Sequence, residues 1–304
     1  MLNDQAAGLR AMRQATKPTA KPKAQNPTAP PKPQPKPVRV ITVASGKGGV
    51  GKTNLSVNLA ISLSKLGGRV LLMDADMSLA NVDIMLGLQT KYNLSHVLDG
   101  EKTLREVIVD GPGGIKIIPA SSGVKRMAQL SALENAGIIN AFTELSDDLD
   151  VLIVDTAAGI ADSVVSYCRA AQEVIVVVCD EPASITDAYA LIKVLSRDYQ
   201  ITRFRLVANM SRSPAHSRRL YEKFSRVCEQ FLQVHIDYFG TVPFDQALRD
   251  AVQKQVPVTL GQPMSPSAKA FKDMAKKLQT WPMPSGVNGY LQFFVENLFN
   301  RKSH

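Results

Sequence analysis

The chain has 304 residues, of which 45% are hydrophobic, and this is enough for one large α/β domain or two small ones. Residues 1–37 hold seven Lys or Arg and one Asp, so they carry +6 of the net charge of +9 and leave +3 for the rest. That division disfavours a nucleic-acid-binding face on the folded part. No run of 18 apolar residues could span a membrane, and the polar N-terminus lacks the apolar core of a signal peptide. Three cysteines without a pairing pattern indicate a reducing cytoplasm.

The first 37 residues form two predicted segments. Residues 1–15 are expected to form a short helix with Asp4 as its N-cap. That helix is too small to be stable alone, so it is either a frayed terminus or a segment that folds on a partner. Residues 16–37 contain eight prolines, five lysines and no acid, which predicts an extended, semi-rigid, solvated linker. The position of this helix at the end of such a spacer favours the second interpretation, in which the helix is a tethered segment that binds a partner.

From Val38 onward, predicted strands and helices alternate, and several strands are apolar along most of their length. This pattern is typical of an α/β fold with a doubly wound, mostly parallel sheet and helices on both faces. The strands are predicted at Val38–Ala44, Arg69–Met73, Ile115–Pro119, Val151–Val154, Val174–Cys179, Phe204–Asn209 and Tyr238–Val242. The helices are predicted at Lys52–Leu66, Ser131–Leu145, Ala161–Ala171, Ser184–Arg197, Ser213–Gln233, Phe244–Gln253 and Ser265–Thr280.

The first strand runs into a glycine-rich loop and then into a helix, and the spacing matches the phosphate-loop pattern G-x-x-x-x-G-K-[ST]. Glycines let backbone N–H groups converge on an anion, and the helix N-terminus adds its positive dipole end. Lys52 supplies a charge to the outer phosphates, and Thr53 supplies a hydroxyl to Mg²⁺. The loop predicts nucleotide phosphates and Mg²⁺ as ligands, bound at Gly46, Lys47, Gly48, Gly49, Val50, Gly51, Lys52 and Thr53.

Two more apolar strands end in carboxylates, and ligands of such sheets lie beyond the carboxyl ends of the strands. The expected metal residues are Thr53, Asp76 and Asp155: Asp155 is placed to hold Mg²⁺ through water, and Asp76 is also the candidate to orient the attacking water. Gly159 would let a backbone N–H approach the γ-phosphate. The alternative for each single Asp is a helix cap or a turn. The four histidines lack metal-ligand spacing and are expected to be surface or structural residues.

Lys47, inside KGGVGKT, is not needed by an ordinary phosphate loop. The stretch resembles the deviant Walker A box of the MinD/ParA/Soj class of ATPases. The resemblance implies that Lys47 crosses to the nucleotide of a partner subunit. Two copies would then form a dimer around two ATP molecules and separate to monomers with ADP. The residues expected to take part in hydrolysis are Lys47, Lys52, Asp76 and Asp155.

Further segments carry the same resemblance. DADMSLANVD (Asp74–Asp83) looks like switch I of the MinD branch, and DTAAG (Asp155–Gly159) looks like switch II. LVANM is similar to the adenine-recognising segment, so Asn209 would read the base and Pro243 would lie against it. Many MinD-type proteins carry Arg where this chain has Met210.

Within that branch, DQAAGLR resembles the N-terminal activator motif of the FlhG/FleN flagellar-number regulators, and EPASITDAYALIK also resembles that family. The resemblance implies that the motif stimulates the GTPase FlhF, with Gln5 as its key residue. Other implied partners are a flagellar transcription activator of the FlrA/FleQ type and components of the flagellar switch complex. The motif residues expected to contact FlhF are Asp4, Gln5, Leu9 and Arg10.

The C-terminal tail predicts an amphipathic helix with aromatic anchors that could lie in a bilayer interface. The alternative is a helix docked on the protein's own core. The residues expected to enter the membrane are Leu291, Phe294, Val295, Leu298 and Phe299.

The sequence therefore predicts four parts: residues 1–15, a partner-activating helix; 16–37, a linker; 38–282, a MinD-like ATPase domain; and 283–304, a membrane-targeting helix. The protein is expected in the cytoplasm, peripherally on the inner face of the membrane near a flagellated pole, without direct DNA binding. One alternative is a ParA-type partition ATPase that binds DNA non-specifically. The other is a scaffold that binds nucleotide and does not depend on turnover.

Overall fold

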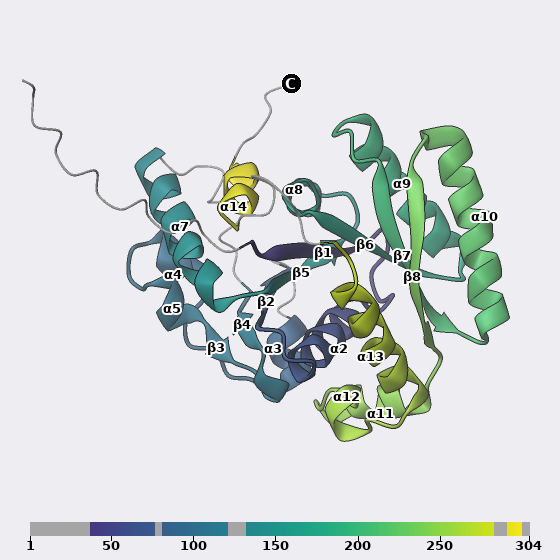
Figure 1. Ribbon diagram of the computed structural model, residues 1–304, viewed down its shortest axis with the longest axis horizontal. Coiled ribbons are helices and arrows are strands. Elements are labelled where there is room, and N and C mark those ends of the chain that lie inside the picture. Colours follow the sequence, from purple (N-terminus) through teal and green to yellow (C-terminus); the bar gives the residue numbers. More distant parts are fainter. Residues whose placement is uncertain (1–36, 77–80, 121–131, 283–290, 300–304) are drawn as a thin grey trace, which may run out of the picture. The chain divides into compact units, whose positions relative to one another are not determined.

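The computed structural model describes residues 37–76, 81–120, 132–282 and 291–299. Eight strands within these ranges form one sheet in the order β3-β4-β2-β5-β1-β6-β7-β8 (Figure 1). Every neighbouring pair is parallel except β3 and β4. The strands are β1 (Arg39–Ser45), β2 (Val70–Ala75), β3 (Val109–Asp110), β4 (Lys116–Ile118), β5 (Val151–Ala158), β6 (Glu173–Cys179), β7 (Arg203–Ser211) and β8 (His235–Pro243).

Helices cover both faces of the sheet, which confirms the predicted doubly wound architecture. The longer helices are α2 (Lys52–Lys65), α7 (Ala132–Leu145), α8 (Asp162–Ala170), α9 (Pro182–Arg197), α10 (Pro214–Leu232), α11 (Gln246–Gln253), α13 (Pro266–Gln279) and α14 (Leu291–Phe299). The shorter ones are α3 (Asn81–Leu86), α4 (Leu94–Leu98), α5 (Leu104–Val107) and α12 (Val258–Gly261). None of the helices in the described ranges has the length and apolarity to cross a membrane.

The alternation of β1 shows how the sheet divides the core into two layers. Ile41 and Val43 lie in a buried cluster with α2 and α13, while Val38 and Val40 lie in a cluster with α7, α8 and α14. Successive side chains of a strand point to opposite faces, so a continuous apolar run is what a central parallel strand requires. All seven predicted strands are present. The antiparallel β3 was not predicted because two residues carry no periodicity.

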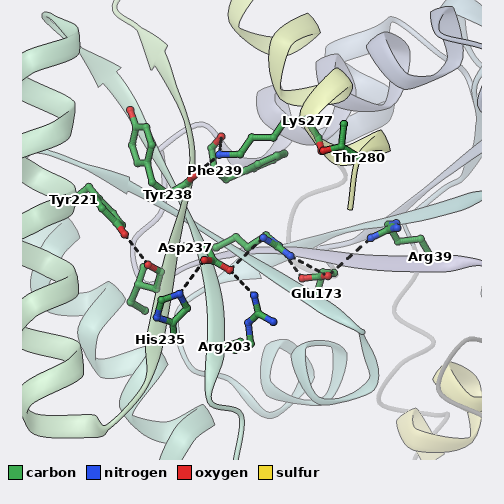
Figure 2. Close-up of polar contacts among 12 residues, drawn as sticks. Arg39, Glu173, Arg203, Tyr221, His235, Asp237, Tyr238, Phe239, Lys277 and Thr280 are labelled. Carbon is green, nitrogen blue, oxygen red and sulfur yellow. Dashed lines mark hydrogen bonds and ion pairs between the residues drawn. The ribbon is translucent and has the colours of Figure 1, made fainter. Parts of the chain in front are cut away.

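A network of charged side chains fixes the end of α13 at the amino-terminal end of β1, away from the phosphate loop (Figure 2). Arg39 Nη2 donates to the carbonyl oxygens of Trp281 and Pro282, each at 2.9 Å. The guanidinium of Arg205 lies 3.4 Å from the centre of the Trp281 ring and forms two hydrogen bonds with Glu173, at 2.8 and 3.2 Å. Bidentate pairing and stacking both exploit the planar guanidinium. The residues that follow α13 are therefore fixed to the sheet as far as Pro282.

Candidate active site

The loop between β1 and α2 folds into a concave anion site. Gly49 and Gly51 have φ angles of 78° and 90°, a left-handed backbone that other residues adopt at a cost. Gly46 is required for space, because a Cβ there would lie 2.0 Å from the carbonyl carbon of Asp187. α2 begins at Lys52, so its first N–H groups and its positive dipole end face the loop. The geometry confirms the predicted strand–loop–helix context.

Two adjoining cavities open beside this loop. The first has a volume of about 780 Å³ and is lined by the glycine loop, Thr53 and Asp76. The second has a volume of about 310 Å³ and is lined by Asn209, Pro243 and Phe244. The residues that line both are Gly51, Asn54, Val252 and Gln253. Together the cavities have room for the phosphates of a nucleotide at one end and its base at the other.

Lys52 and Asp155 form a buried charged centre beneath the loop. Lys52 is 8% exposed, and Asp155 is fully buried in β5. Burial lowers the pKa of Lys52, while the carboxylates of Asp155 and Asp76 oppose that shift. Burial raises the pKa of Asp155 to about 6, against the hydroxyls of Thr53 and Ser56 and the charge of Lys52. The structure thus brings Lys52, Asp76 and Asp155 together, although they lie far apart along the sequence.

Asp74 and Asp76 follow from β2 beside the same centre, and both are buried. Burial, and then the charge of Asp155, raise the pKa of Asp74 to about 7. Asp74 Oδ1 accepts a hydrogen bond from Asp76 N at 3.0 Å, and Oδ2 accepts from the N–H groups of Asn81 and Val82, each at 3.1 Å. Asn81 Nδ2 in turn donates to Asp76 Oδ2 at 3.2 Å. The segment that resembles switch I is therefore anchored to Asp74 at Asp76 and again at Asn81 and Val82.

These residues fit Mg²⁺ in combination with a polyphosphate. Asp155 Oδ1 accepts from Ser56 Oγ at 2.8 Å, while Oδ2 is buried without a partner of hydrogen-bonding geometry in the described part of the chain. A buried oxygen of this kind is costly unless water or a cation meets it. The buried charges beside the loop are three carboxylates and, among the described residues, one lysine, Lys52, so the site has an excess of negative charge that a cation would balance. No group of three or more His, Cys, Asp or Glu in the described residues could hold a metal ion alone; with Mg²⁺, phosphate oxygens and water would supply the other ligands.

Lys47 lies apart from this centre. Its Nζ is 2.9 Å from Glu181 Oε2, and the two side chains are 40% and 58% exposed. The hydrogen bond and the charge of Glu181 raise the pKa of Lys47. Glu181 is the N-cap residue of α9 and lies two residues after β6, which ends at Cys179. In a single copy Lys47 is thus held against α9, and it does not line the phosphate cavity.

Two groups that were predicted to contact the nucleotide, the Asn209 side chain and the Gly159 N–H, form hydrogen bonds within the chain. Asn209 Nδ2 donates to Val50 O at 2.6 Å, and its Oδ1 accepts from Met210 N at 2.8 Å. One amide N–H and one oxygen lone pair remain for a base. The Gly159 N–H, expected near the γ-phosphate, donates to Ser45 O at 2.9 Å, so that bond must break before it reaches a phosphate.

Comparison with known proteins settles the class. The sequence model of the ParA family, described as NUBPL iron-transfer P-loop NTPase, matches residues 36–279. The chain is 56% identical over 262 residues to antiactivator FleN of Pseudomonas aeruginosa, covering 86% of this chain and 94% of that protein. It is 33% identical over 261 residues to flagellum site-determining protein YlxH of Helicobacter pylori, covering 84% of this chain and 88% of the relative. The solved structure of MinD cell division protein from Aquifex aeolicus matches with a TM-score of 0.63 and 28% identity, covering 81% of this chain and 99% of MinD.

The chain belongs to the FleN branch of the ParA/MinD P-loop NTPases. It is an ATPase of the MinD type, as the phosphate loop predicts. Membership in this branch also confirms the resemblance that the sequence motifs indicate.

The C-terminal helix of this FleN-branch protein is docked on its own domain. Leu291, Phe294 and Val295 are 0%, 1% and 0% exposed. They belong to one buried cluster with Ile138 and Phe142 of α7. Leu298 packs partly buried against the same cluster. In this state the apolar face lies in a groove beside α7 and α8, which is the alternative that the sequence left open; its entry into a membrane stays a prediction.

The remaining predicted contact residues fall outside what the structure describes. These are Asp4, Gln5, Leu9 and Arg10 of the N-terminal motif and the side chain of Phe299. Three residues of the FleN-branch site had no individual role predicted from the sequence: Asp74, Asn81 and Glu181. Asp74 and Glu181 follow predicted strand ends, and all three residues lie in segments that resemble the family, DADMSLANVD and EPASITDAYALIK.

Proposed function

We propose that the chain is a nucleotide-switched ATPase that regulates flagellar number and position from the inner face of the cell membrane. ATP with Mg²⁺ pairs two copies and frees α14 for lipid; hydrolysis separates them and α14 docks again. The observation that carries this proposal is the burial of Leu291, Phe294 and Val295 on an ATPase domain whose second loop lysine, Lys47, is held away from its own phosphate cavity.

In the ATP-bound state, the loop N–H groups and Lys52 would bind the phosphates, and Thr53 and Asp155 would hold the metal with water. Mg²⁺ would supply charge neutralisation on the phosphate oxygens. Asp76 orients the attacking water beside the terminal phosphate. Asn209 and Pro243 border the cavity that suits the base. Lys52, Thr53 and Asp76 line the phosphate cavity.

Pairing of two copies rests on Lys47. Its partner in the single copy is an exposed carboxylate, and exposed ion pairs hold little free energy. A triphosphate of a second copy offers several negative oxygens in a site from which water is excluded, so it competes well for the lysine. Lys47 would then leave Glu181 and cross the twofold axis.

Membrane residence rests on α14. Burial of its three enclosed side chains contributes a gross stabilisation of about 5–9 kcal/mol, and ordering the helix offsets much of it. Docking is therefore reversible, and lipid can compete for the same face. One helix would bind a membrane weakly, whereas two helices on one dimer bind far more tightly through effective concentration.

The flagellar role is supported by the names of the relatives, antiactivator FleN and flagellum site-determining protein YlxH. The proposed partners are FlhF, a transcription activator of the FlrA/FleQ type and flagellar switch components. DQAAGLR supplies the FlhF-activating contacts at Asp4, Gln5, Leu9 and Arg10. The protein would act in the cytoplasm, on the membrane near the flagellated pole.

A peptide of residues 1–15 is expected to accelerate GTP hydrolysis by FlhF at least about tenfold, because activators acting in trans complete a catalytic centre. The measurement is the FlhF turnover rate at saturating peptide. A peptide with Gln5→Ala should lose the effect, and one with Gln14→Ala should keep it. An unchanged FlhF rate with the natural peptide would contradict the FlhF role and leave the ATPase assignment intact.

A further inference from the structure

The carboxylate of Asp76 has to point in one direction to orient a water, and its position at the end of a strand does not fix that direction. The terminal torsion of an Asp side chain is broad and roughly two-fold, so the carboxylate can rotate unless a neighbour holds it. In this structure one oxygen, Oδ2, accepts from Asn81 Nδ2 at 3.2 Å. A carboxylate can only accept, so the amide nitrogen of Asn81 must be the group that faces it.

Asn81 is itself held by Asp74. Asp74 Oδ2 accepts from the backbone N–H groups of Asn81 and Val82, each at 3.1 Å. Its Oδ1 accepts from Asp76 N at 3.0 Å. Asp74 is 2% exposed, so water does not compete for these bonds. The result is a closed triangle in which Asp74 sets the backbone of both neighbours and Asn81 sets the carboxylate of Asp76.

We propose that Asn81 is a positioning residue for ATP hydrolysis: its side-chain amide, placed by the buried Asp74, fixes the rotation of the Asp76 carboxylate that orients the attacking water. This inference rests on the role of Asp76 in the proposed function. Asn81 lines the phosphate cavity together with Asp76, so the triangle lies at the place where the terminal phosphate would sit. Asn81 acts through Asp76 and has no direct part in nucleotide binding.

The first experiment measures steady-state ATP hydrolysis by the full chain with Asn81→Ala. The backbone N–H of residue 81 still bonds to Asp74, so the local fold is retained. Misplacing a catalytic group by about 1 Å can cost a hundredfold in rate, so kcat should fall between about tenfold and a hundredfold. KM for ATP should change by less than about twofold, because the interaction serves the transition state and not ground-state binding. A raised KM with unchanged kcat would overturn the proposal.

Two further variants test the mechanism of the loss. Asn81→Asp keeps the shape but replaces the donor by a second carboxylate, so it should be at least as slow as Asn81→Ala. Adding Asn81→Ala to Asp76→Ala should cause no further loss, since the amide then has nothing to orient. Full activity of Asn81→Asp, or an equal further loss in the double variant, would overturn the proposal. Asn140→Ala, at an exposed position of α7, is the matched control and should behave like the natural chain.

The outcomes separate this inference from the proposed function. If Asp76→Ala slows hydrolysis and Asn81→Ala does not, the positioning role fails and the role of Asp76 stands. If Asp76→Ala hydrolyses ATP at the natural rate, both fail. Thermal unfolding midpoints of all variants in the absence of nucleotide should agree with the natural chain, which keeps a folding defect from passing as a catalytic one.

Discussion

The Asp76→Ala variant is expected to hydrolyse ATP at least about a hundredfold more slowly than the natural chain, while it still binds ATP and pairs with a second copy. A positioned carboxylate acting on a water contributes about 10²–10⁴ in rate. The phosphate contacts of the loop, Lys52 and Thr53 are left in place, so the bound state forms and then persists. ATP-bound dimers should therefore accumulate.

The measurement pairs a phosphate-release assay with gel filtration in the presence of Mg²⁺ and ATP. Asp273→Ala, which removes an exposed carboxylate of α13, is the control and should match the natural chain. A variant of Asp76 that turns over normally would contradict its catalytic role. A variant that elutes only as a monomer with ATP would contradict the link between slow hydrolysis and a stable pair.

The second large effect is expected at Lys47. Lys47→Ala should weaken ATP-dependent pairing at least about thirtyfold, because truncating one partner of a desolvated charge pair across an interface is costly. Binding of ATP to a single copy should change little, since Lys47 does not line the phosphate cavity. Analytical ultracentrifugation with a non-hydrolysable ATP analogue measures the dissociation constant.

Glu181→Gln provides the opposite perturbation. It removes the charge that holds Lys47 in the single copy and leaves a side chain of the same size. Exposed ion pairs are weak, so pairing should strengthen by no more than about fivefold. Weaker pairing of Glu181→Gln would show that Glu181 serves the dimer itself. Unaltered pairing of Lys47→Ala would remove the basis for a shared nucleotide.

The phosphate loop and the seven longer strands could be predicted because each depends on residues adjacent in the sequence. The spacing of Gly46, Lys52 and Thr53 matches the phosphate-loop pattern, and apolar β-branched runs are typical of central strands. The helices α3, α4, α5 and α12 were not predicted, because a helix of four to six residues shows little more than one turn of periodicity. Their formation depends on capping contacts such as those of Asn93 and Thr103.

The contacts that organise the site could not be predicted, because they join residues whose distance is set by the fold. Glu181 lies 134 positions from Lys47, and nothing local in the sequence links the two. Asp74 and Asp76 both come directly after the apolar run of one strand, and only the structure shows that Asp74 bonds three backbone N–H groups while Asp76 faces the cavity.

The sequence also could not decide whether the apolar face of α14 packs on the protein or enters a membrane. Leu291, Phe294 and Val295 suit a lipid interface and a protein groove equally, since both are apolar. The choice depends on whether Ile138 and Phe142 of α7 leave a groove open, which is a property of packing. The two alternatives of the sequence analysis thus become two states of one helix in the proposed cycle.

The most direct test of that cycle is co-sedimentation of the full chain with anionic lipid vesicles, comparing ADP with a non-hydrolysable ATP analogue. Val295→Asp should sediment with neither nucleotide, because the charge spoils the lipid-binding face. Ile138→Asp, which places a charge in the cluster that receives α14, should sediment more with ADP than the natural chain does, but less than with the ATP analogue, because a monomer offers one helix. For the natural chain, we expect strong sedimentation with the ATP analogue and little with ADP; equal sedimentation with the two nucleotides would contradict nucleotide control of α14.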